Sequence, residues 1–210
     1  MLANSQGIAA EAERHGARET RVVHLGTDVP AHASVPEDPR SVVTVAHLVA
    51  RKRHADVIRA LALLDDVRYY VIGDGPERPA LEALARDLGV HARFLGQLPH
   101  EEALATARRC AVFALPSVDE AFGVVYVEAM AGGLPAIGAV GEPGPEEIGD
   151  GLVQVPPGDI EALAHALREL LDHPEWRNEV GQRARRNVME RFTWERCGHE
   201  TVAAYEEALR

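Results

Sequence analysis

Residues 115–138, with the sequence LPSVDEAFGVVYVEAMAGGLPAIG, constrain the fold more than any other stretch of the chain. The apolar run that leads into them, 111–115, is short and bounded, as a buried strand is, and a proline ends it. A loop follows over 117–121. From Val124 the apolar residues recur at helical steps, until a pair of glycines stops the helix. A second apolar run at 136–137 begins another strand. These signals predict a strand–loop–helix–strand unit of an α/β sheet.

The unit contains two glutamates, Glu120 in the loop and Glu128 in the helix, eight positions apart. Because Glu120 precedes the helix, it is expected at the carboxyl end of the strand, where open α/β sheets bind ligands. The N–H groups near Phe122, Gly123 and Val124 lie at the helix start, which favours an anion, and glycine lets a phosphate approach closely. The pattern therefore favours two carboxylates that bind sugar hydroxyls beside a phosphate. The alternative is that neither glutamate binds a ligand, so that Glu120 is a solvated loop residue and Glu128 an ordinary surface residue of the helix.

The full string PSVDEAFGVVYVEAMAGGLP is similar to the E-x7-E signature of the retaining GT-B glycosyltransferases of group 1 (family 4). The usual form of that signature is PS-x-x-E-x-FG-x-x-x-x-EAMA-x-G-x-P, and all eleven fixed positions agree. The resemblance implies that Glu128 accepts the ribose hydroxyls of a nucleotide sugar and that Glu120 contacts the donor sugar as a catalytic residue. It also implies that the N–H groups from Phe122 to Val124 hold the diphosphate, and that no cofactor is needed.

A basic cluster, Arg51, Lys52, Arg53 and His54, follows a predicted strand at 42–46. At a strand-to-helix turn the positive end of the helix dipole adds to the charge of such side chains. Cleavage of a sugar–diphosphate bond builds negative charge on the leaving phosphate, and fixed cations stabilise that charge without a metal. The alternative is a solvated helix start with no role in binding.

In the group 1 family the corresponding turn reads G-R-x-x-x-x-K-G, and Lys52 matches its lysine. The resemblance therefore implies that Lys52 contacts the diphosphate and acts in catalysis. The chain departs from the pattern at three positions, since Ala46 replaces the first glycine, His47 the arginine and Arg53 the second glycine. A neutral histidine supplies one donor and no charge. A diphosphate contact by His47 would therefore need compensation from Arg51 or Arg53.

Two further loops follow predicted strands. Residues 94–98, FLGQL, are similar to the family's FLG-x-h turn, which implies that the backbone of Gln97 and Leu98 borders the nucleobase. Backbone contact leaves no side-chain signature, so the sequence does not indicate which base is bound. Residues 138–144 resemble the glycine-rich loop that follows the last sheet strand of the pocket. Those glycines admit a ligand or simply form a turn.

Strand and helix signals alternate along the body of the chain. Short loops between alternating elements predict an α/β fold with a doubly wound, Rossmann-like parallel sheet. By the resemblance, this sheet is the C-terminal half of a GT-B architecture. The expected strands are 42–46, 67–72, 93–95, 111–115 and 136–137, and the expected helices are 53–64, 77–88, 101–108, 124–131, 159–171, 175–188 and 194–209.

The first 40 residues do not resemble the start of a domain. A helix capped by Asn4 or Ser5, a strand at 21–25 and a proline-rich linker at 26–39 are similar to the ANS…hxGhD pattern that closes the first domain of the family. We therefore expect three parts: 1–40, the tail of a missing N-terminal acceptor domain plus a linker; 41–192, the nucleotide-sugar-binding domain; and 193–210, a C-terminal crossover helix. The expected partners are a nucleotide sugar, the acceptor domain and, through exposed terminal helices, a second copy. The alternative is an ordinary N-terminal hairpin.

Composition and motif searches exclude several other classes. With 22 basic and 33 acidic residues the net charge is −11, which argues against nucleic acid as a partner. No apolar run approaches the roughly 18 residues of a membrane span, and the first residues do not form a signal peptide. Two cysteines support neither a disulfide framework nor a metal site, so a cytoplasmic location is expected, with peripheral membrane contact through the missing domain. Neither a P-loop nor a dinucleotide fingerprint is present.

The sequence thus predicts the donor domain of a retaining, hexosyltransferase-type glycosyltransferase, inactive in transfer without its acceptor domain. Two alternatives stay open at this stage. One is a GT-B nucleotide-sugar epimerase, and the other is a module that binds a nucleotide sugar without any reaction.

Overall fold

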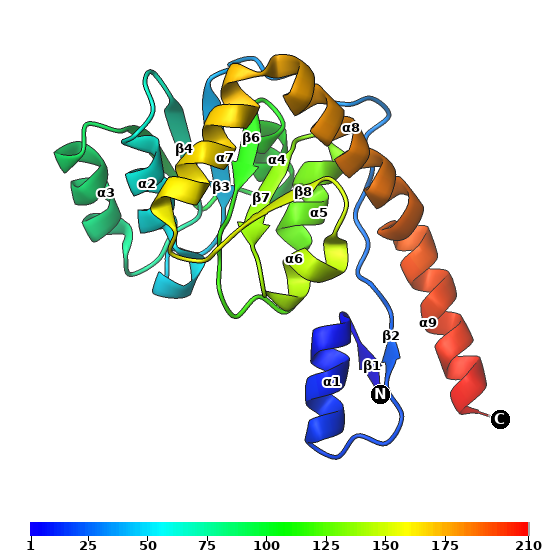
Figure 1. Cartoon of the computed structure of the whole chain (residues 1–210). Coiled ribbons are helices and arrows are strands. Elements are labelled where there is room, and N and C mark those ends of the chain that lie inside the picture. Colours follow the sequence, from blue (N-terminus) through cyan, green and yellow to red (C-terminus); the bar gives the residue numbers. More distant parts are fainter. Residues whose placement is uncertain (210) are drawn as a thin grey trace.

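The computed structural model describes residues 1–209 and has the α/β architecture that the sequence predicts. A six-stranded, fully parallel sheet lies at the centre, with helices on both faces (Figure 1). Its strand order is β5-β4-β3-β6-β7-β8. The strands are β3 (Ser41–Val45), β4 (Arg68–Ile72), β5 (His91–Gly96), β6 (Val112–Ala114), β7 (Ala136–Ala139) and β8 (Leu152–Val155).

Two apolar clusters, one on each face of the sheet, make up the core. Successive residues of a strand point to opposite faces, so Val42 belongs to one cluster and Val43 to the other, and both are fully buried. The Val42 cluster packs against α2 (His54–Leu61), α3 (Arg78–Asp87) and α7 (Ile160–Asp172). The Val43 cluster packs against α4 (His100–Ala107), α5 (Val124–Ala131) and the C-terminal half of α8 (Pro174–Arg191).

The strand order reverses between β3 and β6. From β3 the chain runs outward to β4 and β5, then returns to the centre as β6 and continues the other way to β7 and β8. Open α/β sheets bind ligands in the crevice outside the carboxyl ends of the two strands at such a switch point. A ligand site is therefore expected at the segments that leave β3 and β6.

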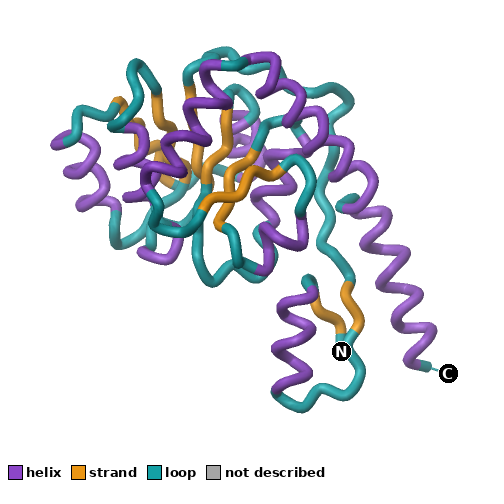
Figure 2. Tube along the Cα trace, in the orientation of Figure 1, coloured by secondary structure: helices purple, strands orange, loops and turns teal. Residues whose placement is uncertain are grey.

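The N-terminal segment stands beside the main sheet. A two-stranded parallel sheet, β1 (Leu2–Ala3) with β2 (Arg21–Val22), flanks α1 (Gln6–Arg14), whose N-terminal cap is Ser5, one of the two predicted candidates. The linker that follows, residues 23–40, contains no helix or strand (Figure 2). We expected α1 to expose an apolar face, and this was wrong. Ala9 is buried, and α1 packs on α6 (Pro143–Ile148) with Gly7 against Pro143.

The C-terminal helix α9 (Trp194–Ala208) does expose apolar side chains, as predicted. It extends away from the sheet next to the N-terminal segment (Figure 1). Trp194, Val202 and Tyr205 are 51%, 58% and 63% exposed. The amide of Thr27 donates to the carbonyl of Phe192 at 2.9 Å, which joins the linker to the start of this helix. Within residues 1–209 no helix is both long and apolar enough to cross a membrane.

One strand of the sheet, β8, was not predicted, so the loop at 138–144 does not follow the last strand of the sheet. The bounds of the predicted sheet strands are shifted by one or two residues, and the strand expected at 21–25 is shorter, because β2 ends at Val22. β5 begins two residues earlier than expected because it is an edge strand. Its side chains alternate between exposed and half-buried positions. It therefore lacks the continuous apolar run by which a central strand is recognised in the sequence.

Candidate functional site

The switch point brings together two loops that are distant in sequence. The 3₁₀ turn Ala50–Lys52 lies beyond β3, and residues 117–121 follow β6. The backbone N–H of Val118 donates to the carbonyl of Arg51 at 2.8 Å, and the guanidinium of Arg51 donates to the carbonyl of Asp119 at 3.3 Å. These contacts fix the two loops against each other at the carboxyl end of the sheet.

Lys52 and Glu120, both predicted as catalytic residues, form an ion pair through Nζ and Oε2. Each side chain is only 11% exposed. The hydroxyl of the buried Ser117 donates to the same oxygen at 3.0 Å. The other oxygen, Oε1, accepts no hydrogen bond from residues 1–209. Glu120 is therefore held by one oxygen and keeps the other for a ligand.

The predicted phosphate loop has the geometry expected of an anion site. Gly123 is the N-cap of α5 with a φ of 80°, and no side chain among residues 1–209 caps the helix. The backbone N–H groups of Gly123 and Val124 have no acceptor within residues 1–209. A Cβ at Gly123 would lie 2.4 Å from the ring of Tyr126, so both the backbone angle and the packing require glycine. The side chain of Phe122 is buried, which leaves its backbone for any contact.

Glu128 lies on α5 next to the start of α4. Its Oε1 is 3.5 Å from Nε2 of His100, the first residue of α4. Burial raises the pKa of Glu128, while the charges of His100 and Arg108 lower it. His100 closely follows Gln97, which is exposed, and Leu98, which packs in the same apolar cluster as α5. The structure thus places Glu128 beside the loop that the sequence assigned to the nucleobase.

The basic cluster does not act as one unit, and this corrects the prediction. Arg53 donates to Asp56 at 2.5 Å, within its own helix turn. His54 is fully buried, and burial lowers its pKa to about 4, so it carries no charge at neutral pH. Its Nε2 donates to the carbonyl of His47 at 3.3 Å. Only Arg51 and Lys52 of this cluster contact the loop after β6. His47, which is not part of the cluster, is exposed and lies just beyond the end of β3.

Sequence reasoning assigned no role to several polar residues around Glu120. The hydroxyl of Tyr126 donates to the carbonyl of Leu115 and lies 3.2 Å from the Ser117 hydroxyl; burial raises its pKa. Glu142 accepts the backbone N–H of Glu120 at 2.9 Å. Ser117 belongs to the family signature, but the contacts of Tyr126 and Glu142 depend on tertiary packing that no spacing reveals.

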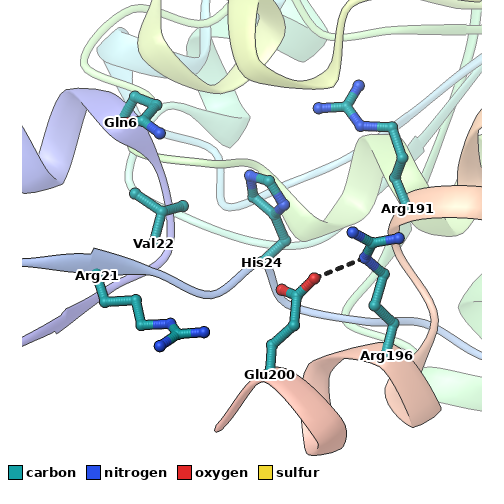
Figure 3. Close-up of a pocket in the computed structure, with 7 residues that line it drawn as sticks. All are labelled: Gln6, Arg21, Val22, His24, Arg191, Arg196 and Glu200. Atoms are coloured by element: carbon teal, nitrogen blue, oxygen red, sulfur yellow. Dashed lines mark hydrogen bonds and ion pairs between the residues drawn. The ribbon is translucent and has the colours of Figure 1, made fainter. Parts of the chain in front are cut away.

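A separate cavity of about 290 Å³ lies between the N-terminal segment and the start of α9 (Figure 3). Three arginines line it. Arg196 pairs with Glu200 and Arg21 with Glu207, whereas the guanidinium of Arg191 donates to the carbonyls of Glu147 and Ile148 and to the amide oxygen of Asn187. The cavity lies apart from the switch point of the sheet, and none of the predicted site residues lines it. The part of the chain described here contains no cluster of three histidine, cysteine or carboxylate side chains arranged to bind a metal.

A Rossmann-like sheet with an ion-paired carboxylate and an open helix N-terminus at its switch point places this chain in the class of doubly wound α/β domains. The family model for the group 1 glycosyl transferases matches residues 28–187, so the chain belongs to that family. It is a domain of the C-terminal, donor-binding type.

Three similar proteins illustrate the relationship. A GDP-mannose-dependent mannosyltransferase of Corynebacterium glutamicum, which acts on monoacylated phosphatidylinositol monomannoside, is 32% identical over 166 residues, covering 73% of this chain and 43% of the relative. Sucrose-phosphate synthase of Thermosynechococcus elongatus superposes with a TM-score of 0.89 at 26% identity, over 99% of this chain and 58% of that structure. HepE of Anabaena, in complex with UDP-glucose, shares the fold with a TM-score of 0.87 at 22% identity, over 98% of this chain and 63% of that structure. The chain thus spans about half the length of these proteins.

Proposed function

We propose that the chain binds a nucleotide-diphosphate sugar and serves as the donor domain for retaining transfer of a hexosyl group. The observation that carries this proposal is the Lys52–Glu120 pair at the switch point between β3 and β6. The ammonium of Lys52 would meet the diphosphate, and the free Oε1 of Glu120 would accept hydroxyls of the donor sugar. A retaining outcome comes from the family resemblance alone.

The remaining site residues divide between the phosphates and the nucleoside. The free N–H groups of Gly123 and Val124 and the backbone near Phe122 would bind the diphosphate, with Arg51 and His47 at the rim. Glu128 would accept the ribose hydroxyls, and the backbone of Gln97 and Leu98 would border the base. HepE binds UDP-glucose, and the Corynebacterium relative uses GDP-mannose, so both nucleotides belong in the test.

Fixed cations, rather than a metal ion or another cofactor, would balance the charge of the leaving diphosphate in this proposal. Lys52 supports it, because its ammonium lies at the switch point, in ion-pair contact with Glu120. Affinity for the donor should therefore be the same with added Mg²⁺ and with EDTA. A donor that binds only when Mg²⁺ is present would contradict this part of the proposal.

Transfer itself would need an acceptor domain that closes over the donor, excludes water and aligns the reactants. Residues 1–40 and α9 would form the junction with that domain. The chain alone should bind donor and hydrolyse it slowly at most. Product analysis would separate transfer from epimerisation, because an epimerase converts the donor sugar without any acceptor.

Calorimetric titration of UDP, UDP-glucose, GDP and GDP-mannose tests the proposal directly. Glu120→Ala should spare the free nucleotide and weaken only the sugar conjugate, whereas Glu128→Ala should weaken both. The loss for Glu128→Ala should be about 1.5–3 kcal/mol for each charged hydrogen bond removed. Glu146→Ala is a matched control, since this exposed glutamate forms no side-chain hydrogen bond within residues 1–209. Equal affinities of all three variants and the parent would contradict the assignment.

A further inference from the structure

Both backbone groups of Glu120 are hydrogen-bonded to the turn that begins α6. Its N–H donates to Oε2 of Glu142 at 2.9 Å, and its carbonyl accepts from the N–H of Gly144 at 3.1 Å. Glu142 lies 22 residues further along the chain, beyond β7. Tertiary contact, rather than the local sequence of the loop after β6, therefore sets the backbone of Glu120.

The composition of the turn makes this arrangement specific. Pro143 and Pro145 have no N–H, so Gly144 supplies the only backbone donor among the first three residues of α6. That donor is occupied by the carbonyl of Glu120. A Cβ at Gly144 would lie 2.3 Å from the carbonyl oxygen of Phe122, so a larger residue does not fit.

Glu142 does not use its side chain for its own helix. It occupies the N-cap position of α6 with an extended backbone, yet forms no capping hydrogen bond. Its carboxylate instead accepts from Glu120, and a hydrogen bond to an ionised acceptor is roughly twice as strong as a neutral one. The bond stabilises a loop in which Asp119 has a φ of 55°. Most residues with a side chain avoid this conformation, so the loop would change its backbone angles without such contacts.

We infer that Glu142 is a positioning residue for Glu120. Its carboxylate and the N–H of Gly144 fix the backbone of Glu120, while Lys52 and Ser117 fix one side-chain oxygen. Together these contacts fix the orientation of the Glu120 carboxylate, and with it the direction in which Oε1 faces a donor sugar. The role in sugar binding rests on the proposed function, whereas the role in ordering the loop does not.

The ordering role is tested without any ligand, by amide hydrogen exchange at Glu120 measured by NMR. Glu142→Ala removes the acceptor and should speed exchange by about tenfold or more, as expected for loss of a charged hydrogen bond. Glu142→Gln keeps an oxygen acceptor and should restore most of the protection. Glu146→Ala, in the same helix, should match the parent. Unchanged exchange in Glu142→Ala would overturn the inference.

The positioning role is tested by comparing UDP-glucose with UDP, and GDP-mannose with GDP. The parent should bind the sugar conjugate that it recognises more tightly than the matching nucleotide. Glu142→Ala should reduce that sugar-dependent gain, Glu142→Gln should keep it, and Glu142→Ala should have no further effect in a Glu120→Ala background. If Glu142→Ala and Glu142→Gln lose the sugar-dependent gain in affinity equally, the charge of Glu142 matters rather than its hydrogen bond, and the inference is overturned. If no nucleotide sugar binds the parent, the proposed function fails while the exchange experiment still decides the ordering role.

Discussion

Nε2 of His54 lies 3.3 Å from the carbonyl oxygen of His47 and ties α2 to the end of β3. A carbonyl only accepts, so the neutral imidazole must carry its proton on Nε2. The pKa of His54 is lowered to about 4, chiefly by desolvation; the hydrogen bond to His47 opposes the shift, and the nearby charge of Lys52 adds to it. The rim of the candidate site is thus supported by a histidine that burial keeps uncharged at neutral pH.

The free energy of unfolding should fall as the pH drops from about 6.5 towards 4. In this range His54 is protonated in the unfolded chain but stays neutral in the folded protein, so protonation favours unfolding. Above the unfolded pKa of 6.5 the contribution is fully present. The loss attributable to His54 between pH 7 and pH 5 should be about 2 kcal/mol. Urea unfolding at both pH values measures it. In His54→Gln, which cannot titrate, the fall over this range should be correspondingly smaller, and parallel curves would contradict the prediction.

Nucleotide binding should weaken as the pH falls through the raised pKa of Glu128. Only the carboxylate accepts two ribose hydroxyls without donating, and burial already favours the protonated form. Titrations of UDP and GDP across the acidic range in the parent and in Glu128→Gln measure the effect. The variant should bind more weakly at neutral pH but with a flatter pH profile. A variant as pH-dependent as the parent would assign the effect to another group.

Gly73→Ala should destabilise the fold. Gly73 has a φ of 130°, and a Cβ there would lie 2.0 Å from the carbonyl oxygen of Ala46. The backbone strain alone costs about 1–3 kcal/mol, and displacement of Ala46 would disturb His47. Gly198→Ala in α9 is the control, since no atom of residues 1–209 outside its own helix backbone lies within 4 Å of the new methyl group. It should be neutral or stabilising by about 0.5–1 kcal/mol in chemical denaturation.

The chain should self-associate through α9. Trp194, Val202 and Tyr205 are each more than half exposed, and apolar patches of this kind mark interfaces. Light scattering should show a mass that rises with concentration. Val202→Glu combined with Tyr205→Glu should keep the chain monomeric without changing nucleotide affinity, because α9 lies apart from the switch point. A parent that is monomeric at every concentration would refute the prediction.

The sequence predicted most elements of the sheet because alternating apolar runs and helical spacing are local properties. It also predicted Glu120 and Lys52 as site residues, but not their ion pair, since they are 68 positions apart and meet only through strand order. His54 was misassigned as a cation because burial, which a basic tetrapeptide does not reveal, decides its charge. β8 was missed because four residues with two half-buried positions give too weak a pattern.

The Lys52–Glu120 pair also affects which anions the domain can bind. An ammonium already matched by a carboxylate shows little net charge to a passing anion, so inorganic phosphate gains little by displacing Glu120. A molecule that carries both a phosphate and hydroxyl groups can bind both residues at once. Its phosphate forms an ion pair with Lys52, and its hydroxyls donate hydrogen bonds to Glu120. We therefore expect the pair to discriminate between the intact donor and its separate fragments, before any acceptor is present.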